Sequence, residues 1–254
     1  KIRSYNILRH LGKRHEVCLA SLIDEQCDLR FVDQVKSLAC EFVFDTIRPA
    51  LRKASSVSSL LQSKPISVAY FYSRSLQRQI DDLIRRYEFS VTFCFSSPMA
   101  EYVFRSAHRD GRLRHSLRVM DLVDVDSQKW AQYAQRSAVW KRWIYRYEAA
   151  RLAHYERKIV RAFDHVLVVS DQEKQLVSTA LGSDKARVMT NGVDLHFFTP
   201  QDPVKRLTDA PTLVFTGVMD YWPNIEGVAW FAESVLPRIR AAMPDTAFYV
   251  VGAR

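Results

Sequence analysis

Hydrophobic residues recur along the chain with two different spacings, one typical of amphipathic helices and one typical of buried strands. In the first segment, Ile2, Tyr5, Leu8 and Leu11 fall on one helical stripe that ends near Gly12. Similar stripes predict helices over residues 3–14, 29–40, 73–88, 97–108, 127–161, 171–182 and 225–242. A serine-rich segment, 49–63, is compatible with a helix or a loop. Short apolar runs predict strands over 16–22, 41–47, 89–95, 117–124, 164–170, 186–193, 212–217 and 247–252.

Strands and helices alternate throughout, which is typical of an α/β protein with a parallel sheet. The runs "VTFCF", "HVLVV" and "TLVFTG" are continuously apolar, as expected of strands buried on both faces. The pattern therefore predicts a Rossmann-like doubly wound parallel sheet, and the start of a second Rossmann-like domain after it.

A proline-containing polar stretch interrupts this alternation. Pro200, Pro203 and Pro211 lie among polar residues, after which the strand–helix pattern begins again. We therefore expect a first domain over 1–196, a linker over 197–211 and the first βαβ unit of a second domain over 212–254.

Composition narrows the function classes. The chain has 254 residues, of which 48% are hydrophobic and 26% charged, with a formal net charge of +9. This composition indicates a globular protein, and the charge favours anionic partners such as nucleic acid, phosphorylated ligands or an anionic membrane. The four cysteines form no CxxC pair and are expected to be buried reduced thiols of a reducing compartment. No apolar run approaches the ~20 residues of a membrane span.

The strand over 117–124 ends in acidic residues. Asp121, Asp124 and Asp126 lie where ligands gather in doubly wound sheets, so they could orient sugar hydroxyls or act as a base. The structural alternative is that Asp126 and Ser127 cap the following helix and that backbone donors hold Asp121. The sequence favours this alternative for Asp126 and leaves Asp121 and Asp124 open.

Ser170 and Glu173 form the Ser-x-x-Glu pattern of a capping box at the start of a predicted helix. In such a box the serine hydroxyl accepts from the Glu173 N–H, and the glutamate carboxylate reaches back to the serine N–H. A ligand could also lie there, and the negative charge of Glu173 suits a neutral polyol better than a phosphate.

The helical region 127–161 combines aromatic and basic residues. A stripe including Leu152, Tyr155 and Ile159 predicts a core-facing side with a solvated basic back. The alternative is an interfacial surface on which basic side chains meet lipid phosphates and Trp143 lies at headgroup level. The membrane-facing candidates are Lys141, Arg142, Trp143 and Arg146.

Two further segments lie next to predicted strand ends. Gly217 ends a strand before a loop and helix, an arrangement that lets phosphates approach the backbone, although GxGxxG and Walker A motifs are absent. Asn191-Gly192 follows another strand, but the next residues do not alternate as a hairpin would. We expect positive φ angles at Asn191 and Gly192, Asp194 bonded to nearby backbone donors, and Phe197 and Phe198 packed against one domain.

The order of several segments resembles that of the family-4 glycosyltransferases of the GT-B fold. The similar segments are "KIRSYNILRHLGKRHEV", "DLVDVDSQKW", "VSDQEKQLV", "VMTNGVDLHFFTP" and "LVFTGVMDYWPNIEGVAWFAESVLPRI". Within the family, the chain is most similar to the exopolysaccharide glycosyltransferases associated with exosortase/PEP-CTERM systems.

This resemblance implies two Rossmann-like domains facing a cleft and a retaining, metal-independent transfer from a nucleotide-diphospho-sugar to a saccharide or lipid-linked acceptor. It places Asp121, Asp124, Ser170 and Glu173 on the acceptor side, Gly217, Asp220 and Asn224 at the donor, and Asn191, Gly192 and Asp194 at the hinge. It also implies a cytoplasmic protein, peripheral at the inner face of the plasma membrane, with no cofactor. The sequence shows no RNP aromatics or Cys2His2 spacing, so no nucleic-acid partner is expected.

The resemblance has departures. The family's first strand and glycine-rich loop would precede Lys1, and its paired donor-site glutamates would follow Arg254. Val218 and Glu226 stand where many members carry Arg and Lys. We therefore expect this segment alone to be inactive. A sugar-nucleotide epimerase of the same fold and a non-catalytic polyanion-binding domain remain alternatives.

Overall fold

The computed structural model describes residues 2–47, 64–199 and 210–252. The chain divides into two compact units, Lys1–Gly192 and Val193–Arg254. The serine-rich segment 49–63 lies outside the described residues, as do residues 200–209 of the predicted linker.

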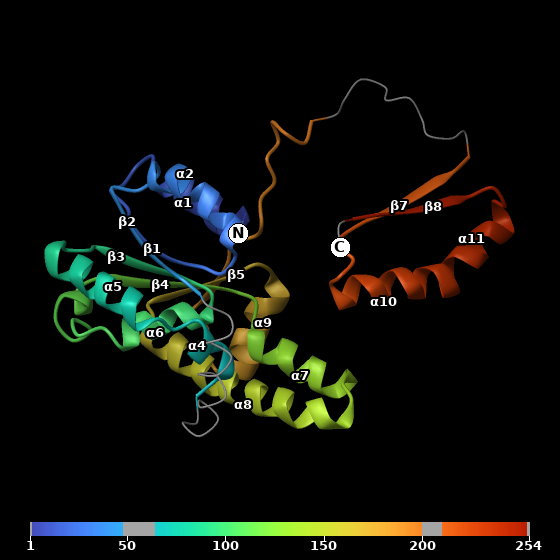
Figure 1. Cartoon of the computed structure of the whole chain (residues 1–254). Helices are drawn as coiled ribbons and strands as arrows, with labels where there is room; N and C mark the ends of the chain where they lie inside the picture. Colours follow the sequence, from blue (N-terminus) through green and yellow to red (C-terminus); the bar gives the residue numbers. More distant parts are fainter. Residues whose placement is uncertain (1, 48–63, 200–209, 253–254) are drawn as a thin grey trace. The chain divides into compact units, whose positions relative to one another are not determined.

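The first unit contains two parallel sheets (Figure 1). The larger has the strand order β3 (Val91–Phe95), β4 (Leu117–Val123), β5 (His165–Val168) and β6 (Ala186–Val188), and the smaller pairs β1 (Cys18–Ile23) with β2 (Glu41–Thr46). The protein is therefore α/β with parallel sheets, as predicted, and consistent with a Rossmann-like doubly wound arrangement. The sequence predicts a single sheet in this unit, whereas the described strands form two separate sheets, β1–β2 and β3–β6.

The larger sheet is fully buried on one face only. Its strands follow one another in chain order, so right-handed crossovers bring the connecting helices to the same side. On that side, a row of residues in register across the four strands is buried: Cys94, Met120, Val166 and Ala186. Along β5, burial alternates, with His165 and Leu167 half-buried. The expectation that "VTFCF" and "HVLVV" are buried on both faces is therefore wrong.

Most helices of the first unit follow the predicted pattern. They are α1 (Ile2–Leu11), α2 (Val32–Lys36), α4 (Ile66–Tyr70), α5 (Arg74–Arg86), α6 (Ala100–Phe104), α7 (Asp126–Arg136), α8 (Val139–Ala162) and α9 (Asp171–Leu181), with 3-10 turns at Gln26–Phe31, Ser97–Met99 and Arg112–Arg114. The predicted helix 29–40 is a 3-10 turn followed by the short α2, and α4 was not predicted.

The region predicted as one long helix is a helical hairpin. The chain is extended at Ser137 and Ala138, where it turns from α7 into α8. Trp130, Tyr133 and Tyr145 pack together between the two helices, with ring centroids 5.3 to 6.5 Å apart. This aromatic cluster fixes α7 against α8.

The second unit is a single βαβ arrangement. It contains β7 (Thr212–Thr216), α10 (Trp222–Trp230), a π-helical turn (Phe231–Val235), α11 (Leu236–Ala242) and β8 (Ala247–Val251), and β7 pairs with β8 in parallel. Pro237 lacks the N–H of a regular helix, which accounts for a distortion of the helix just before it. Phe231 of the turn packs against Phe248 of β8 in a tilted arrangement, with ring centroids 4.9 Å apart.

The other face of this two-stranded sheet is open. Val214 is 57% exposed and Val251 is 54% exposed. The expectation that "TLVFTG" is buried on both faces is therefore also wrong, because the helix covers only one side of the two strands.

The cysteines differ from the prediction as well. Cys94 is buried, whereas Cys27 and Cys40 are exposed and Cys18 is half-buried. The Sγ atoms of Cys18 and Cys40 lie 3.5 Å apart at the starts of the thinly covered β1–β2 pair. The expectation that all four thiols are buried is therefore wrong, because Cys18 and Cys40 lie in or beside a small sheet that the described residues cover only partly and Cys27 lies in an exposed 3-10 turn.

Candidate functional site

The carboxyl ends of β3 and β4 carry an unusual backbone. Ser96 and Val123 have φ angles of 72° and 69°, in a region that side chains other than glycine rarely adopt. Each such residue costs about 1–3 kcal/mol, so surrounding contacts must hold these turns in place. One of these contacts is a hydrogen bond of 2.8 Å from the Ser96 N–H to the Asp121 carbonyl.

Asp121 lies at the centre of these contacts and is fully buried. Its carboxylate accepts from Arg3 Nε at 2.8 Å, from Arg3 Nη2 at 3.2 Å and from the Val123 N–H at 3.2 Å. A bidentate pair of this kind fixes the geometry of both groups. The carboxylate is buried and already accepts hydrogen bonds from Arg3 and Val123. Its position therefore favours a structural role over direct contact with an acceptor.

Arg3 also joins α1 to the residues that follow β6. Its Nη1 donates to the Thr190 carbonyl at 3.3 Å and to Asn191 Oδ1 at 3.1 Å. Neither Asn191 nor Gly192 has a positive φ, so that expectation is wrong. The residues after β6 therefore have negative φ angles, and the hydrogen bonds from Arg3 to Thr190 and Asn191 hold them in place.

Beyond this exit, Asp194 organises the start of the second unit. Its Oδ1 accepts from the N–H groups of His196 and Phe197 at 2.9 and 3.2 Å. Phe197 and Phe198 are 76% and 64% exposed and contact each other edge to face. Within the second unit, among the described residues, the two rings are therefore not packed into a core, and their packing against the first domain stays a prediction.

Asp124 is more accessible than Asp121. Its side chain is 28% exposed and pairs with Lys129 Nζ at 2.5 Å. Lys129 also lies 3.6 Å from Asp126, whose pKa is raised by burial and whose carboxylate accepts from Ser97 Oγ. Of the two aspartates proposed for the acceptor side, Asp124 is the one that a ligand could reach.

The start of α7 is capped from another helix. The helix begins at Asp126 without a capping side chain from its own sequence, contrary to the expected capping by Asp126 and Ser127. Instead, the buried Glu156 of α8 accepts from the Ser127 N–H at 3.2 Å and from Ser127 Oγ at 2.5 Å. Burial raises the pKa of Glu156 from 4.5 to about 7.

Ser170 and Glu173 form half of the predicted capping box. Ser170 Oγ accepts from the Glu173 N–H at 3.2 Å. The Glu173 carboxylate, however, accepts from the Val125 N–H at 2.7 Å and so links α9 to the loop after β4. Glu173 and Asp124 are thereby brought to the same edge of the sheet, because Val125 adjoins Asp124.

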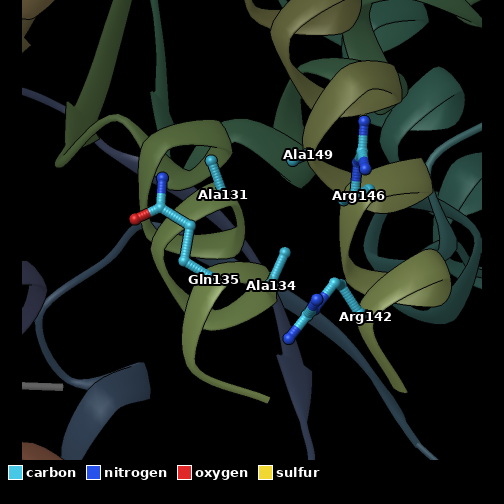
Figure 2. A pocket seen from close by; sticks show the side chains of 6 residues that line it. All are labelled: Ala131, Ala134, Gln135, Arg142, Arg146 and Ala149. Atoms are coloured by element: carbon cyan, nitrogen blue, oxygen red, sulfur yellow. The ribbon is translucent and has the colours of Figure 1, made fainter. Parts of the chain in front are cut away.

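The predicted membrane-facing residues lie on the first part of α8. Lys141, Arg142, Trp143 and Arg146 are all exposed. Between α7 and α8 runs a groove of about 570 Å³ lined by Ala131, Ala134, Gln135, Arg142, Arg146 and Ala149 (Figure 2). The alanines leave this space open, and the two arginines supply its positive charge.

In the second unit, two glycines meet at the carboxyl ends of the strands. The Gly217 N–H donates to the Val251 carbonyl at 3.0 Å, and a Cβ at Gly252 would lie 1.7 Å from the Gly217 oxygen. Asn224 Nδ2 donates to the Val218 carbonyl at 2.8 Å and holds the loop, while Asp220 is exposed. Side chains at either glycine would clash, because Gly252 packs against the Gly217 backbone and Gly217 packs against Asn224 and Phe215.

One group of potential metal ligands occurs among the described residues, at Glu25, Cys27 and Asp28. The hydrogen bond that the Cys27 thiol donates to Glu25 raises the pKa of this thiol.

Sequence reasoning missed the buried contacts of Arg3, Glu148 and Glu156. Glu148 and Glu156 share the helical face of Leu152 and Ile159, so their spacing was an available signal of burial. No such signal connected Arg3 to Asp121, which lie 118 positions apart.

No helix among the described residues is both long and apolar enough to cross a membrane. Comparison of the chain with models of protein families and with curated proteins gives no match.

Proposed function

We propose that this chain belongs to a retaining glycosyltransferase that transfers a sugar from a nucleotide-diphospho-sugar to a saccharide or lipid-linked acceptor of exopolysaccharide synthesis. The observation that carries the proposal is Gly217 at the carboxyl end of β7, from which a loop leads to the N-terminus of α10. A strand, glycine, loop and helix N-terminus in this order suit the diphosphate of such a donor.

The acceptor is assigned to the first unit. Asp124 is partly exposed at the carboxyl edge of β4, and Glu173 is held beside it through Val125. Carboxylates there suit the hydroxyls of a neutral sugar better than a phosphate. Asp121 supports this edge through Arg3, as a positioning residue.

The order of motifs described above supports the family-4 assignment within the GT-B fold. In this proposal no metal or cofactor takes part. The protein acts in the cytoplasm, at the inner face of the membrane that holds its acceptor.

The donor site is tested by calorimetric titration of the chain with a panel of nucleoside diphosphates and nucleotide-diphospho-sugars. Val218 is 52% exposed in the loop after Gly217, so Val218→Glu adds a negative charge without disturbing a core. We expect about tenfold weaker binding from charge repulsion. Met243→Glu is the matched control, because Met243 is 47% exposed at the opposite end of the βαβ unit.

The donor assignment is wrong if no member of the panel binds, or if both variants bind as the unmodified chain does. Transfer is tested separately on the full-length protein, with Asp124→Asn as the variant. We expect retention of anomeric configuration, turnover reduced at least tenfold by Asp124→Asn and no inhibition by chelators. Unchanged turnover in Asp124→Asn contradicts the acceptor-side assignment.

A further inference from the structure

The α7–α8 hairpin is rich in positive charge, and of its basic residues Lys129 is paired with Asp124 and Asp126 at the start of α7. Between Asp126 and Glu148 the sequence has no Asp or Glu, and its basic residues are Lys129, Arg136, Lys141, Arg142 and Arg146. A solvated helix face ordinarily mixes charges of both signs. This stretch therefore differs from an ordinary surface.

The two acids of α8 are both turned inward. Glu148 accepts from the Ile66 N–H at 2.6 Å and from the Ser67 N–H at 2.9 Å, and so caps α4. Glu156 caps α7 through Ser127. Both carboxylates are buried, with 1% and 0% exposure, so neither neutralises the outer face of α8.

The arginines at the hairpin end have no carboxylate partner among the described residues. Arg142 Nη2 makes only a long contact, 3.5 Å, to the Ser137 carbonyl. Arg142 and Arg146 separate the groove shown in Figure 2 from a second hollow of about 350 Å³, which is also lined by Val139 and Trp143. Two neighbouring hollows thus share the same pair of guanidinium groups.

Apolar side chains stand beside this charge. Val139 is 78% exposed and Trp143 is 58% exposed, one helical turn apart. In Figure 1 the end of the hairpin where α7 meets α8 points away from the strands of the sheet. Exposed Trp beside Arg and Lys is the combination expected at the headgroup level of a bilayer.

We propose that the end of the α7–α8 hairpin, formed by Val139, Lys141, Arg142, Trp143 and Arg146, docks on an anionic phospholipid surface. The guanidinium groups of Arg142 and Arg146 bind lipid phosphates, and Trp143 and Val139 enter the headgroup layer. Charge complementarity selects this partner, because the face is uniformly basic. The proposal goes beyond the proposed function and does not require sugar transfer.

The test is co-sedimentation of the chain with vesicles of phosphatidylglycerol and phosphatidylcholine, compared with phosphatidylcholine alone. We expect binding only to the anionic vesicles. Arg142→Gln with Arg146→Gln should weaken binding about thirtyfold, equivalent to about 1 kcal/mol for each residue. Trp143→Ala should weaken it about tenfold. The matched control is Arg74→Gln with Arg78→Gln, an exposed pair with the same spacing on α5.

Several outcomes would overturn the proposal. Equal losses in the hairpin and α5 pairs would show that net charge, not this surface, attracts the vesicles. Equal binding to both vesicle types, or no binding, would exclude an anionic lipid partner. Sedimentation without vesicles that the hairpin variants abolish would assign the surface to a second copy of the chain. Stronger binding to an oligonucleotide than to vesicles would assign it to nucleic acid.

Discussion

The carboxyl edge of the larger sheet and the end of the α7–α8 hairpin are both charged, but they use charge in opposite ways. At the sheet edge, Asp121 is enclosed and bound by Arg3, and Glu173 is bound to the backbone. At the hairpin end, Arg142 and Arg146 are exposed and unpaired with acids among the described residues. Paired charge builds the fold, whereas unpaired charge of one sign is available to an external partner.

The largest expected effect is at the sheet edge, in Asp121→Ala. Removing the carboxylate leaves Arg3 with little solvent access, since only 11% of its side chain is exposed. We expect the free energy of unfolding to fall by about 3–5 kcal/mol. Chemical denaturation measures this change.

Asp110→Ala is the control for Asp121→Ala. The Asp110 side chain is 84% exposed and also pairs with an arginine, Arg109, so we expect a far smaller loss of stability than in Asp121→Ala. If the two variants lose the same stability, Asp121 is not a structural charge and the contrast between the two regions disappears.

The second prediction concerns pH and the buried Glu156. The unfolded chain releases this proton near pH 4.5, whereas the folded protein keeps it until about pH 7. The contribution of Glu156 to the free energy of unfolding is therefore greatest below pH 4.5. It falls by about 3 kcal/mol as the pH rises to 7.

Glu156→Gln removes this titration and retains an acceptor for the Ser127 N–H. Denaturation at pH 5, 6, 7 and 8 should show the variant gaining stability relative to the unmodified chain as pH rises. Glu88→Gln, at an exposed site after α5, is the control and should show no such trend. Parallel pH profiles for Glu156→Gln and the unmodified chain would contradict the assigned burial.

A smaller effect is expected at the cap of α9. Ser170→Ala removes the acceptor of the Glu173 N–H and should cost about 1 kcal/mol. Ser170→Asp restores an acceptor and should recover most of that loss. Chemical denaturation measures this change. If Ser170→Ala leaves the free energy of unfolding unchanged, the hydrogen bond between Glu173 and Val125 alone fixes this edge.

The smallest effect on stability is expected at the hairpin end. Arg142→Gln with Arg146→Gln should change the free energy of unfolding by less than about 0.5 kcal/mol, because these side chains hold no internal ion pair among the described residues. Thermal or chemical unfolding checks this value. A loss above about 2 kcal/mol would mean that these arginines support the fold, as Arg3 does at the sheet edge.

The fold class could be predicted because strand and helix periods alternate clearly along the chain. Gly182, for example, ends α9 in a left-handed conformation with φ of 69°, at the predicted position. The faces of the strands could not be predicted, because an apolar run such as "TLVFTG" does not show how many sides the rest of the molecule covers. The hairpin turn was missed because Ser137-Ala138 contains neither proline nor glycine.

The candidate site was predictable only in part. The positions of Asp124, Ser170 and Glu173 at strand ends followed from the alternation of elements. The pairing of Arg3 with Asp121 did not, because it depends on the three-dimensional placement of α1 over the sheet edge. The inward direction of Glu148 and Glu156, which leaves the α8 surface uniformly basic, required the helix to be placed against its neighbours.

The most direct test of the contrast between paired and unpaired charge is quenching of tryptophan fluorescence by brominated phosphatidylglycerol vesicles. The account predicts strong quenching of the unmodified chain and loss of most of it in Trp143→Phe, since Trp143 enters the headgroup layer. Quenching that is absent, or unchanged in Trp143→Phe, would contradict the assignment of the hairpin end to an anionic membrane.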